Sequence, residues 1–325
     1  MKYLFASFIL LIAIGCLKDN VYSPSLTRYV EVYPANFPDM PLTADNPSTV
    51  EGVELGRMLY YDKILSNNQT QACADCHSQS TAFASTGVNS LAHINLGWSS
   101  SFLWNGKIEG TLEDIMMFEV EDFFGTDVEQ LNQHEDYPVL FKKVFGVDNI
   151  TSKEIAYALA QFFRTLNSYD SKFDRVMQGL ETFTPAEMNG YDIFFTERGD
   201  CFHCHGGALN TDNLFHNNGL DMNPAAGRYV ITQNSSDVGK FKTPTLRNIE
   251  FTAPYMHDSR YETLEEVVYF YSHGLQDSPT IDPLMKFDFS SGVNLNPADQ
   301  ADLVTFLKTF SDTSFLSNPA LSDPF

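Results

Sequence analysis

Two five-residue runs carry the side chains best suited to chemistry in this chain. Residues 73–77 read C-A-D-C-H and residues 201–205 read C-F-H-C-H. Two thiols three residues apart lie on one side of a helical turn, where they can add to the two vinyl groups of a haem, and the histidine that follows can bind the iron. The sequence therefore predicts two sites of one kind, each for a covalently attached c-type haem.

The cysteine count agrees with this interpretation, because four of the five cysteines belong to the two runs. These four are Cys73, Cys76, Cys201 and Cys204. A single C-x-x-C pair also binds zinc or cycles as a redox dithiol. Two copies in separate halves of the chain, each followed directly by histidine, make a zinc ribbon a poor interpretation. We expect His77 and His205 to be the iron ligands.

The fifth cysteine lies in a segment typical of an export signal. A single Lys2 precedes an apolar run over residues 3–14, and Gly15 stands directly before Cys16. The run is too short to cross a bilayer as a mature helix. Residues 1–16 resemble a bacterial lipoprotein signal, which predicts a lipid anchor at Cys16 as the contact with a membrane; plain cleavage to a soluble protein is the alternative. Both place the mature chain in the periplasm.

The charge of the chain limits the kinds of molecule that it can bind. The formal net charge is −22, and such a chain repels the phosphates of nucleic acid. We therefore expect no nucleic-acid partner. The excess of acidic side chains either serves solubility or steers a basic electron-donor protein.

The elements that must position the two motifs are mainly helices. A threonine followed three residues later by an acidic residue predicts helix starts at Thr111, Thr151, Thr184 and Thr263. Asn296, followed by Pro-Ala-Asp, predicts the start of a last helix. Apolar residues recur at helical spacing after these signals, whereas strand signals are sparse.

The length allows two domains that each bury one haem. Residues 17–48 are rich in Pro, Asn, Asp and Ser and predict a tether and an extended N-terminal strap. We expect an N-terminal haem domain over residues 49–168 and a C-terminal haem domain over residues 169–325. The predicted fold is mainly α, with two cytochrome-c-like domains side by side and a last helix able to pack back on the first domain.

Further motifs extend this interpretation to a family. Residues 102–106 read F-L-W-N-G, residues 244–248 read P-T-L-R-N and residues 253–258 read A-P-Y-M-H-D. With the two haem motifs, they resemble the bacterial dihaem cytochrome c peroxidase family, and within it the MauG-like and MbnH-like branch. The resemblance implies that H2O2 reacts at the haem of His77 and that the haem of His205 exchanges electrons.

The resemblance also implies roles for three residues outside the two motifs. Tyr271 matches the position that supplies the second ligand to the C-terminal iron, a methionine in ordinary peroxidases and a tyrosine in MauG-like members. A phenolate there favours ferric and higher oxidation states. Trp104 matches the tryptophan between the haems, and Arg247 is expected to pair with a haem propionate. Without the resemblance, Tyr271 is only the last member of an apolar helix face.

A calcium ion between the haems is a further implication of the resemblance. The family holds it with an asparagine side chain and two backbone carbonyls, and the matching positions are Asn89, Thr252 and Pro254. Ligation by oxygen atoms alone suits Ca²⁺.

The peroxide pocket departs from the family pattern. The family uses Gln, Pro and Glu there, and the matching positions hold Ile115, Glu119 and a residue near 123–125. Glu119 or Glu121 could replace the missing acid if the local backbone shifts, because a carboxylate beside peroxide moves the proton during O–O cleavage. His93 could reach the first iron, or it is a surface or packing residue.

Three functions stay open at this point. The first is a dihaem peroxidase that reduces H2O2 with electrons from a small cytochrome or cupredoxin. The second is a MauG-like or MbnH-like enzyme that oxidises residues of a partner protein, which Tyr271 favours. The third is a non-catalytic dihaem electron carrier, which the altered pocket favours.

Overall fold

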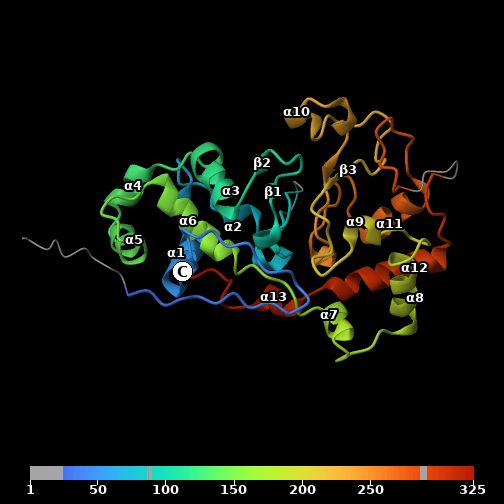
Figure 1. Cartoon of the computed structure of the whole chain (residues 1–325), viewed down its shortest axis with the longest axis horizontal. Coiled ribbons are helices and arrows are strands. Elements are labelled where there is room, and N and C mark those ends of the chain that lie inside the picture. The colour runs from blue at the N-terminus through green and yellow to red at the C-terminus, as the bar shows by residue number, and fades with distance from the viewer. Residues whose placement is uncertain (1–24, 86, 88–89, 286–290) are drawn as a thin grey trace, which may run out of the picture.

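The structure is a computed structural model that describes residues 25–85, 87, 90–285 and 291–325. Two mainly helical halves lie side by side along the long axis of the molecule, α1 to α6 in one and α7 to α12 in the other (Figure 1). The fold is thus mainly α with two cytochrome-c-like domains, as predicted. No helix within the described ranges is both long and apolar enough to span a membrane.

The first half contains α1 (Val50–Tyr61), α2 (Cys73–Cys76), α3 (Leu112–Phe118), α4 (Val128–Gln133), α5 (Tyr137–Phe145) and α6 (Ser152–Phe163). The second half contains α7 (Lys172–Met177), α8 (Pro185–Phe194), α9 (Phe202–His205), α10 (Tyr229–Thr232), α11 (Leu264–His273) and α12 (Pro297–Leu307), and α13 (Thr313–Ser317) follows it. The strands form two antiparallel pairs, β1 (Ser101–Phe102) with β2 (Ile108–Glu109) and β3 (Phe215–His216) with β4 (Phe241–Lys242).

Short helical turns complete the described chain. They are η1 (Lys63–Leu65), η2 (Gln79–Thr81), η3 (Leu96–Trp98), the π-helical turn η4 (Glu119–Phe123), η5 (Ser235–Asp237), η6 (Ile249–Phe251) and η7 (Lys308–Phe310).

The predicted helix starts are confirmed by their capping hydrogen bonds. At Thr111, Thr151, Thr184 and Thr263, the acidic residue three positions later accepts the backbone N–H of the threonine. At Asn296, the side-chain oxygen accepts the N–H groups of the first turn of α12. These bonds satisfy backbone donors that the helix itself leaves without partners.

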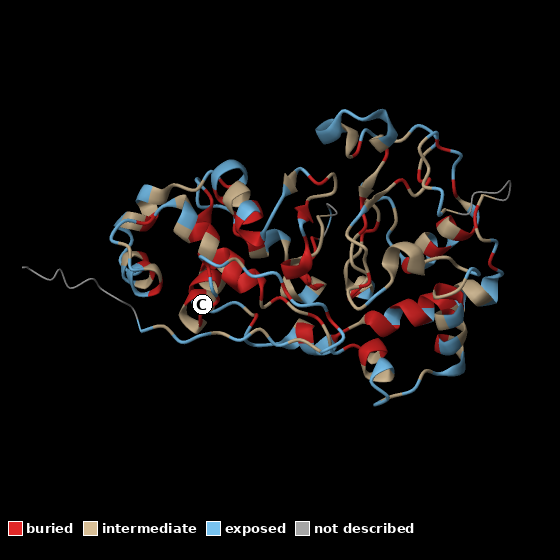
Figure 2. Cartoon of the chain, viewed as in Figure 1, coloured by how far each residue is buried: buried red, intermediate tan, exposed pale blue. Residues whose placement is uncertain are grey.

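The core of the first half is the contact between α1 and α6. Gly56 lies so close to α6 that a Cβ atom there would be 2.0 Å from the carbonyl oxygen of Ala158. This close approach buries Leu55 and Leu59 against Leu159 and its neighbours. Each such side chain contributes about 1.5–3 kcal/mol when it is fully buried. Figure 2 shows that buried residues are concentrated in α6 and in α12.

The second half is built in a similar way around α8 and α12. A Cβ atom on Gly190 of α8 would be 2.3 Å from the carbonyl oxygen of Asp302, so the two helices touch through their backbones. Phe194, Phe306 and Phe310 then form an aromatic cluster with ring centroids 5.2–5.6 Å apart. This core supports one side of the second C-x-x-C-H turn.

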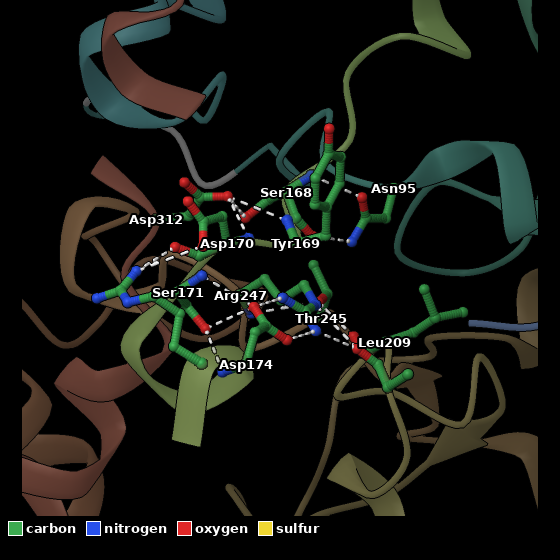
Figure 3. A network of polar contacts seen from close by, with 12 residues as sticks. Asn95, Ser168, Tyr169, Asp170, Ser171, Asp174, Leu209, Thr245, Arg247 and Asp312 are labelled. Atoms are coloured by element: carbon green, nitrogen blue, oxygen red, sulfur yellow. Dashed lines mark hydrogen bonds and ion pairs between the residues drawn. The ribbon is translucent and has the colours of Figure 1, made fainter. Parts of the chain in front are cut away.

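A buried polar network holds the linker between the halves (Figure 3). The carboxylate of Asp312, which follows α12, accepts hydrogen bonds from Ser168 Oγ at 3.1 Å and from the backbone N–H groups of Tyr169 and Asp170 at 3.0 Å. Asn248 donates to Ser168 Oγ at 2.9 Å and accepts the N–H of Asp312 at 2.7 Å. The linker backbone therefore has fixed partners in the second half.

Arg247 belongs to the same network, where a carboxylate of the protein is its partner. Both ends of the guanidinium bind the carboxylate of Asp174, with N–O distances of 2.8 Å, and the expected pairing with a haem propionate stays a prediction. The guanidinium also donates to the carbonyl of Ala208, and its side chain is 1% exposed. A planar guanidinium matches a carboxylate in this paired geometry, which uses its donors inside the protein.

Chain segments from both ends complete the first half. In the N-terminal strap, Thr43 and Asn46 donate to the carboxylate of Glu113, which also forms an ion pair with Arg164. At the other end, α12 stays in the second half, whereas the residues after it return to the first half. There Arg57 Nε donates to the carbonyl of Ser322 at 2.6 Å.

The buried ion pair between Arg247 and Asp174 gives a test of this architecture. We predict that Asp174→Asn lowers the free energy of unfolding by about 3–5 kcal/mol, because it leaves the guanidinium buried without its charge partner. Urea denaturation of the haem-loaded protein measures this loss.

The matched control is Asp237→Asn, which breaks the ion pair with Lys240 outside the core. We expect this change to cost no more than about 1 kcal/mol. Equal losses of unfolding free energy in the two variants would mean that the buried pair of Arg247 and Asp174 stabilises the fold no more than an ion pair outside the core.

Candidate dihaem site

The first C-x-x-C-H run forms the single turn α2 and ends at His77. The thiol of Cys73 is buried, whereas that of Cys76 is exposed. His77 Nδ1 lies 2.8 Å from the carbonyl oxygen of Phe83. Donation of the Nδ1 proton to that carbonyl leaves Nε2 as the iron-binding atom. Burial lowers the pKa of His77 to about 4, so the imidazole is in the neutral form that a metal binds.

The second run forms α9 and repeats this arrangement. His205 Nδ1 lies 3.3 Å from the carbonyl oxygen of Asn210, and burial lowers the pKa of His205 to about 4. Cys201 and Cys204 line the same cavity as His205. The donor set at each motif, two thiols and one neutral imidazole held through Nδ1, fits a covalent haem.

The cavity beside α9 has a volume of about 260 Å³ and a mainly apolar lining. Leucine and valine side chains from α11 and α12 form one wall: Leu264, Val267, Val268, Leu303 and Leu307. Apolar walls of this kind suit the flat, hydrophobic body of a porphyrin, with polar groups at defined points around it.

Tyr271, on α11, lines this cavity. Asn218 Nδ2 donates a hydrogen bond to the Tyr271 hydroxyl oxygen at 3.0 Å. Burial raises the pKa of Tyr271 to about 12, and the bond from Asn218 opposes that rise because it stabilises the phenolate. The phenol is therefore placed and partly prepared to bind a cation such as ferric iron. Met256 also lines the cavity, and its sulfur is 3.7 Å from Asn218 Nδ2.

Trp104 lies at the junction of the two halves. It lines the cavity beside α9, and its carbonyl oxygen accepts the backbone N–H of Lys242 at 2.8 Å. The turn that follows Trp104 needs a glycine, because Gly106 has a φ of +68° and a Cβ atom there would be 2.4 Å from both Arg228 and Phe215 of the second half. A side chain that passes electrons between two haems must contact both domains, and Trp104 lies where this is possible.

His93 does not face His77 across an open site. The two imidazole rings are stacked, with centroids 3.6 Å apart and planes 16° apart, and His93 Nδ1 is 3.1 Å from the Tyr60 hydroxyl. An iron between two histidines is bound through a ring nitrogen from each side, which this face-to-face stack does not allow. In this arrangement His93 packs on the ring of His77, and its binding to the first iron stays a prediction.

Glu119 and Glu121 occupy different environments on η4. The π-helical turn inserts an extra residue into the helix and changes which side chains face inward, a feature that is frequent at functional sites. Glu119 is partly buried, and burial raises its pKa to about 7. Burial raises the pKa of the Cys73 thiol, and the negative charge of Glu119 adds to this effect. Glu121 is exposed, so of the two carboxylates only Glu119 lies toward the first motif.

The predicted calcium ligands are not tested by this arrangement. Asn89 lies outside the described residues. Thr252 lines the cavity beside α9, and its hydroxyl donates to the carbonyl of Ile249 at 3.3 Å. Pro254 follows two residues later. Calcium binding by the three residues stays a prediction.

Two C-x-x-C-H turns in adjoining helical halves, with a tryptophan at the junction, define a dihaem c-type protein. The family model for di-haem cytochrome c peroxidase matches residues 50–182. A cytochrome c551 peroxidase from Nitrosomonas europaea is 32% identical over 265 residues, which cover 73% of this chain and 77% of that protein. The methylamine utilization protein MauG from Methylophilus methylotrophus is 30% identical over 292 residues, which cover 83% of this chain and 85% of that protein.

A solved structure agrees with these relatives. The crystal structure of a MauG-like protein associated with microbial copper homeostasis is 32% identical, has a TM-score of 0.83 and covers 91% of this chain and 99% of its own. This chain therefore belongs to the dihaem cytochrome c peroxidase family, whose members carry two c-type haems. Peroxidases and MauG proteins are both among its relatives at about this level of identity.

We predict that Tyr271→Phe changes the low-spin optical and EPR spectrum while both haems stay attached, because the substitution removes an oxygen ligand and leaves all four thioether bonds. Met256→Leu is the matched control, since it alters another side chain that lines the same cavity. An unchanged spectrum for Tyr271→Phe would remove this tyrosine from the coordination of the iron.

Proposed function

We propose that this protein is a dihaem peroxidase that reduces H2O2 at the first motif with electrons delivered through the second. The observation that carries the proposal is the placement of Glu119, a partly buried carboxylate with a pKa near 7 on the side of the first haem-binding turn. Haem iron supplies the redox chemistry when it is bound. The protein supplies the proton transfers, which need a carboxylate that exchanges protons near neutral pH.

Other groups of the chain support the same division of roles. His77 holds the first iron from one side, and His93 stacks on its ring and leaves the opposite side without a histidine from that loop. Trp104 contacts both halves and so lies on a short route between them. A small cytochrome or cupredoxin is the proposed electron donor, and the net charge of −22 favours a basic one.

Tyr271 favours a second candidate. A tyrosine ligand at the second iron stabilises ferric and higher states and disfavours the reduced state that an electron-entry site needs. In that case the reductant is a tryptophan or tyrosine of a partner protein, as in a MauG-like enzyme. The likeness to a MauG-like protein over 91% of this chain supports the same candidate.

Steady-state turnover separates the two candidates. A peroxidase oxidises two molecules of reduced small cytochrome or cupredoxin for each H2O2 consumed, because the reduction of H2O2 takes two electrons. If neither donor is oxidised while one equivalent of H2O2 still changes the spectrum of the protein, the partner-protein candidate replaces the peroxidase.

We predict that the second-order rate constant for H2O2 depends on the ionisation of Glu119. A carboxylate with a pKa of about 7 is mostly protonated below that pH, so the rate constant should rise with pH and level off above about 7. Glu119→Gln should lower it by about 10²–10⁴-fold and remove the inflection. Stopped-flow mixing with H2O2 between pH 5 and 9 measures both effects.

Glu121→Gln is the control, because Glu121 is exposed on the same turn. It should retain both the rate constant and the inflection. Equal losses in the two variants would mean that charge near η4, and not proton transfer by Glu119, supports the reaction.

We further propose that the mature chain works in the periplasm and is attached to a membrane through a lipid on Cys16. The support is the export-signal pattern of residues 1–16 and the attachment of c-type haem outside the cytoplasm. Metabolic labelling with a radioactive fatty acid, with Cys16→Ala as the unlabelled control, tests the anchor.

A further inference from the structure

Lys242 is a buried cation with few partners in the protein. Its side chain is on β4, and the residue is 5% exposed. The ammonium group donates to Asn213 Oδ1 at 2.8 Å and lies 3.5 Å from Ser101 Oγ. Among the described residues, no carboxylate lies within 4.0 Å of it. A buried charge is costly unless a partner of opposite charge compensates it.

The place of this ammonium indicates where its partner lies. Lys242 lines the cavity beside α9, and its backbone N–H binds the carbonyl oxygen of Trp104. An ammonium has three protons to donate, and the two neutral oxygens use at most two of them. Burial lowers the pKa of Lys242 to about 8, although the negative charge of Asp212 opposes this effect. The protein itself therefore does not fully compensate the positive charge of the Lys242 ammonium.

Other cations near the cavity are already paired. The imidazole of His216 lies between Asp212 and Asp282, with N–O distances of 2.8 and 2.6 Å. Arg247 is bound to Asp174. Lys242 is the one lysine or arginine among the described residues that line the cavity. It is therefore the group best placed to meet an anion that enters with the cofactor.

We propose that Lys242 binds a propionate carboxylate of the haem attached at the second motif, on the side of the cavity where Trp104 lies. The apolar lining suits the porphyrin body, while its propionates need a donor or a cation wherever they leave water. This inference rests on haem binding at the second motif, which the family implies, and it is independent of the reaction with H2O2. It assigns to Lys242 the role that the sequence suggested for Arg247.

The assignment predicts a change in the midpoint potential of the second haem. Without the ammonium, the propionate charge is less compensated and stabilises ferric iron, which has the higher positive charge. Lys242→Met should therefore lower the midpoint potential, and Lys242→Arg should restore most of the wild-type value. Lys240→Met is the matched control, because Lys240 pairs with Asp237 and not with a group of the cavity. It should leave the potential unchanged.

Potentiometric titration of the haem-loaded proteins and resonance Raman spectra of the propionate bending modes measure the two consequences. Electrospray mass spectrometry first confirms two attached haems, and no H2O2 is used, so a failure of the peroxidase proposal leaves this test intact. If Lys242→Met does not accumulate with both haems, Lys242→Arg decides the matter, because a guanidinium in place of an ammonium must shift the propionate modes.

An unchanged midpoint potential and unchanged propionate modes in Lys242→Met would overturn the assignment, as would unchanged modes in Lys242→Arg. A free anion is the other possible occupant. In that case inorganic phosphate added to the wild-type protein should shift the potential of the second haem, and this shift would also overturn the assignment. A lower potential in Lys242→Met, with no response of the wild-type protein to phosphate, is the expected result.

Discussion

The function proposed here depends on a fixed junction between two helical halves. Each half could hold a haem by itself, but electron transfer between two haems requires that their separation does not vary. The buried contacts of Asp312 and the ion pair of Arg247 with Asp174 fix the linker and the first helix after it. Such contacts are costly to break, because each leaves a buried charge or donor without a partner. The polar network therefore holds the linker between the two halves in one arrangement.

The chemistry of each site depends on how burial of its side chains shifts their pKa values. Burial keeps His77 and His205 neutral, so both imidazoles can bind iron at physiological pH. The same effect raises the pKa of Glu119 into the range where proton transfer is efficient. At Tyr271 it raises the pKa far enough that ionisation requires a cation, and Asn218 supplies a donor to the phenolate. Burial thus keeps the two histidines neutral, lets Glu119 exchange protons near neutral pH, and makes Tyr271 a phenolate only when a cation binds it.

Much of the fold was predictable because its signals are local. Capping pairs such as Thr151 with Glu154 act within one turn, and the C-x-x-C-H spacing is itself the geometry of haem attachment. The partner of Arg247 was not predictable, because Asp174 is 73 residues away in sequence. The stack of His93 on His77 and the choice between Glu119 and Glu121 also depend on tertiary packing and on a π-helical turn, which no periodic pattern marks. Asn218 lies in a loop rich in polar residues, so nothing in the sequence distinguished it.

An EPR spectrum of the diferric protein before and after one equivalent of H2O2 shows whether the first iron is open to peroxide. We expect a high-spin signal from the first haem, open opposite His77, and the loss of that signal when peroxide is added. Two low-spin signals that peroxide leaves unchanged would contradict this expectation. They would mean that the first iron has a sixth protein ligand, and that the protein, in this oxidation state, transfers electrons without reacting with peroxide.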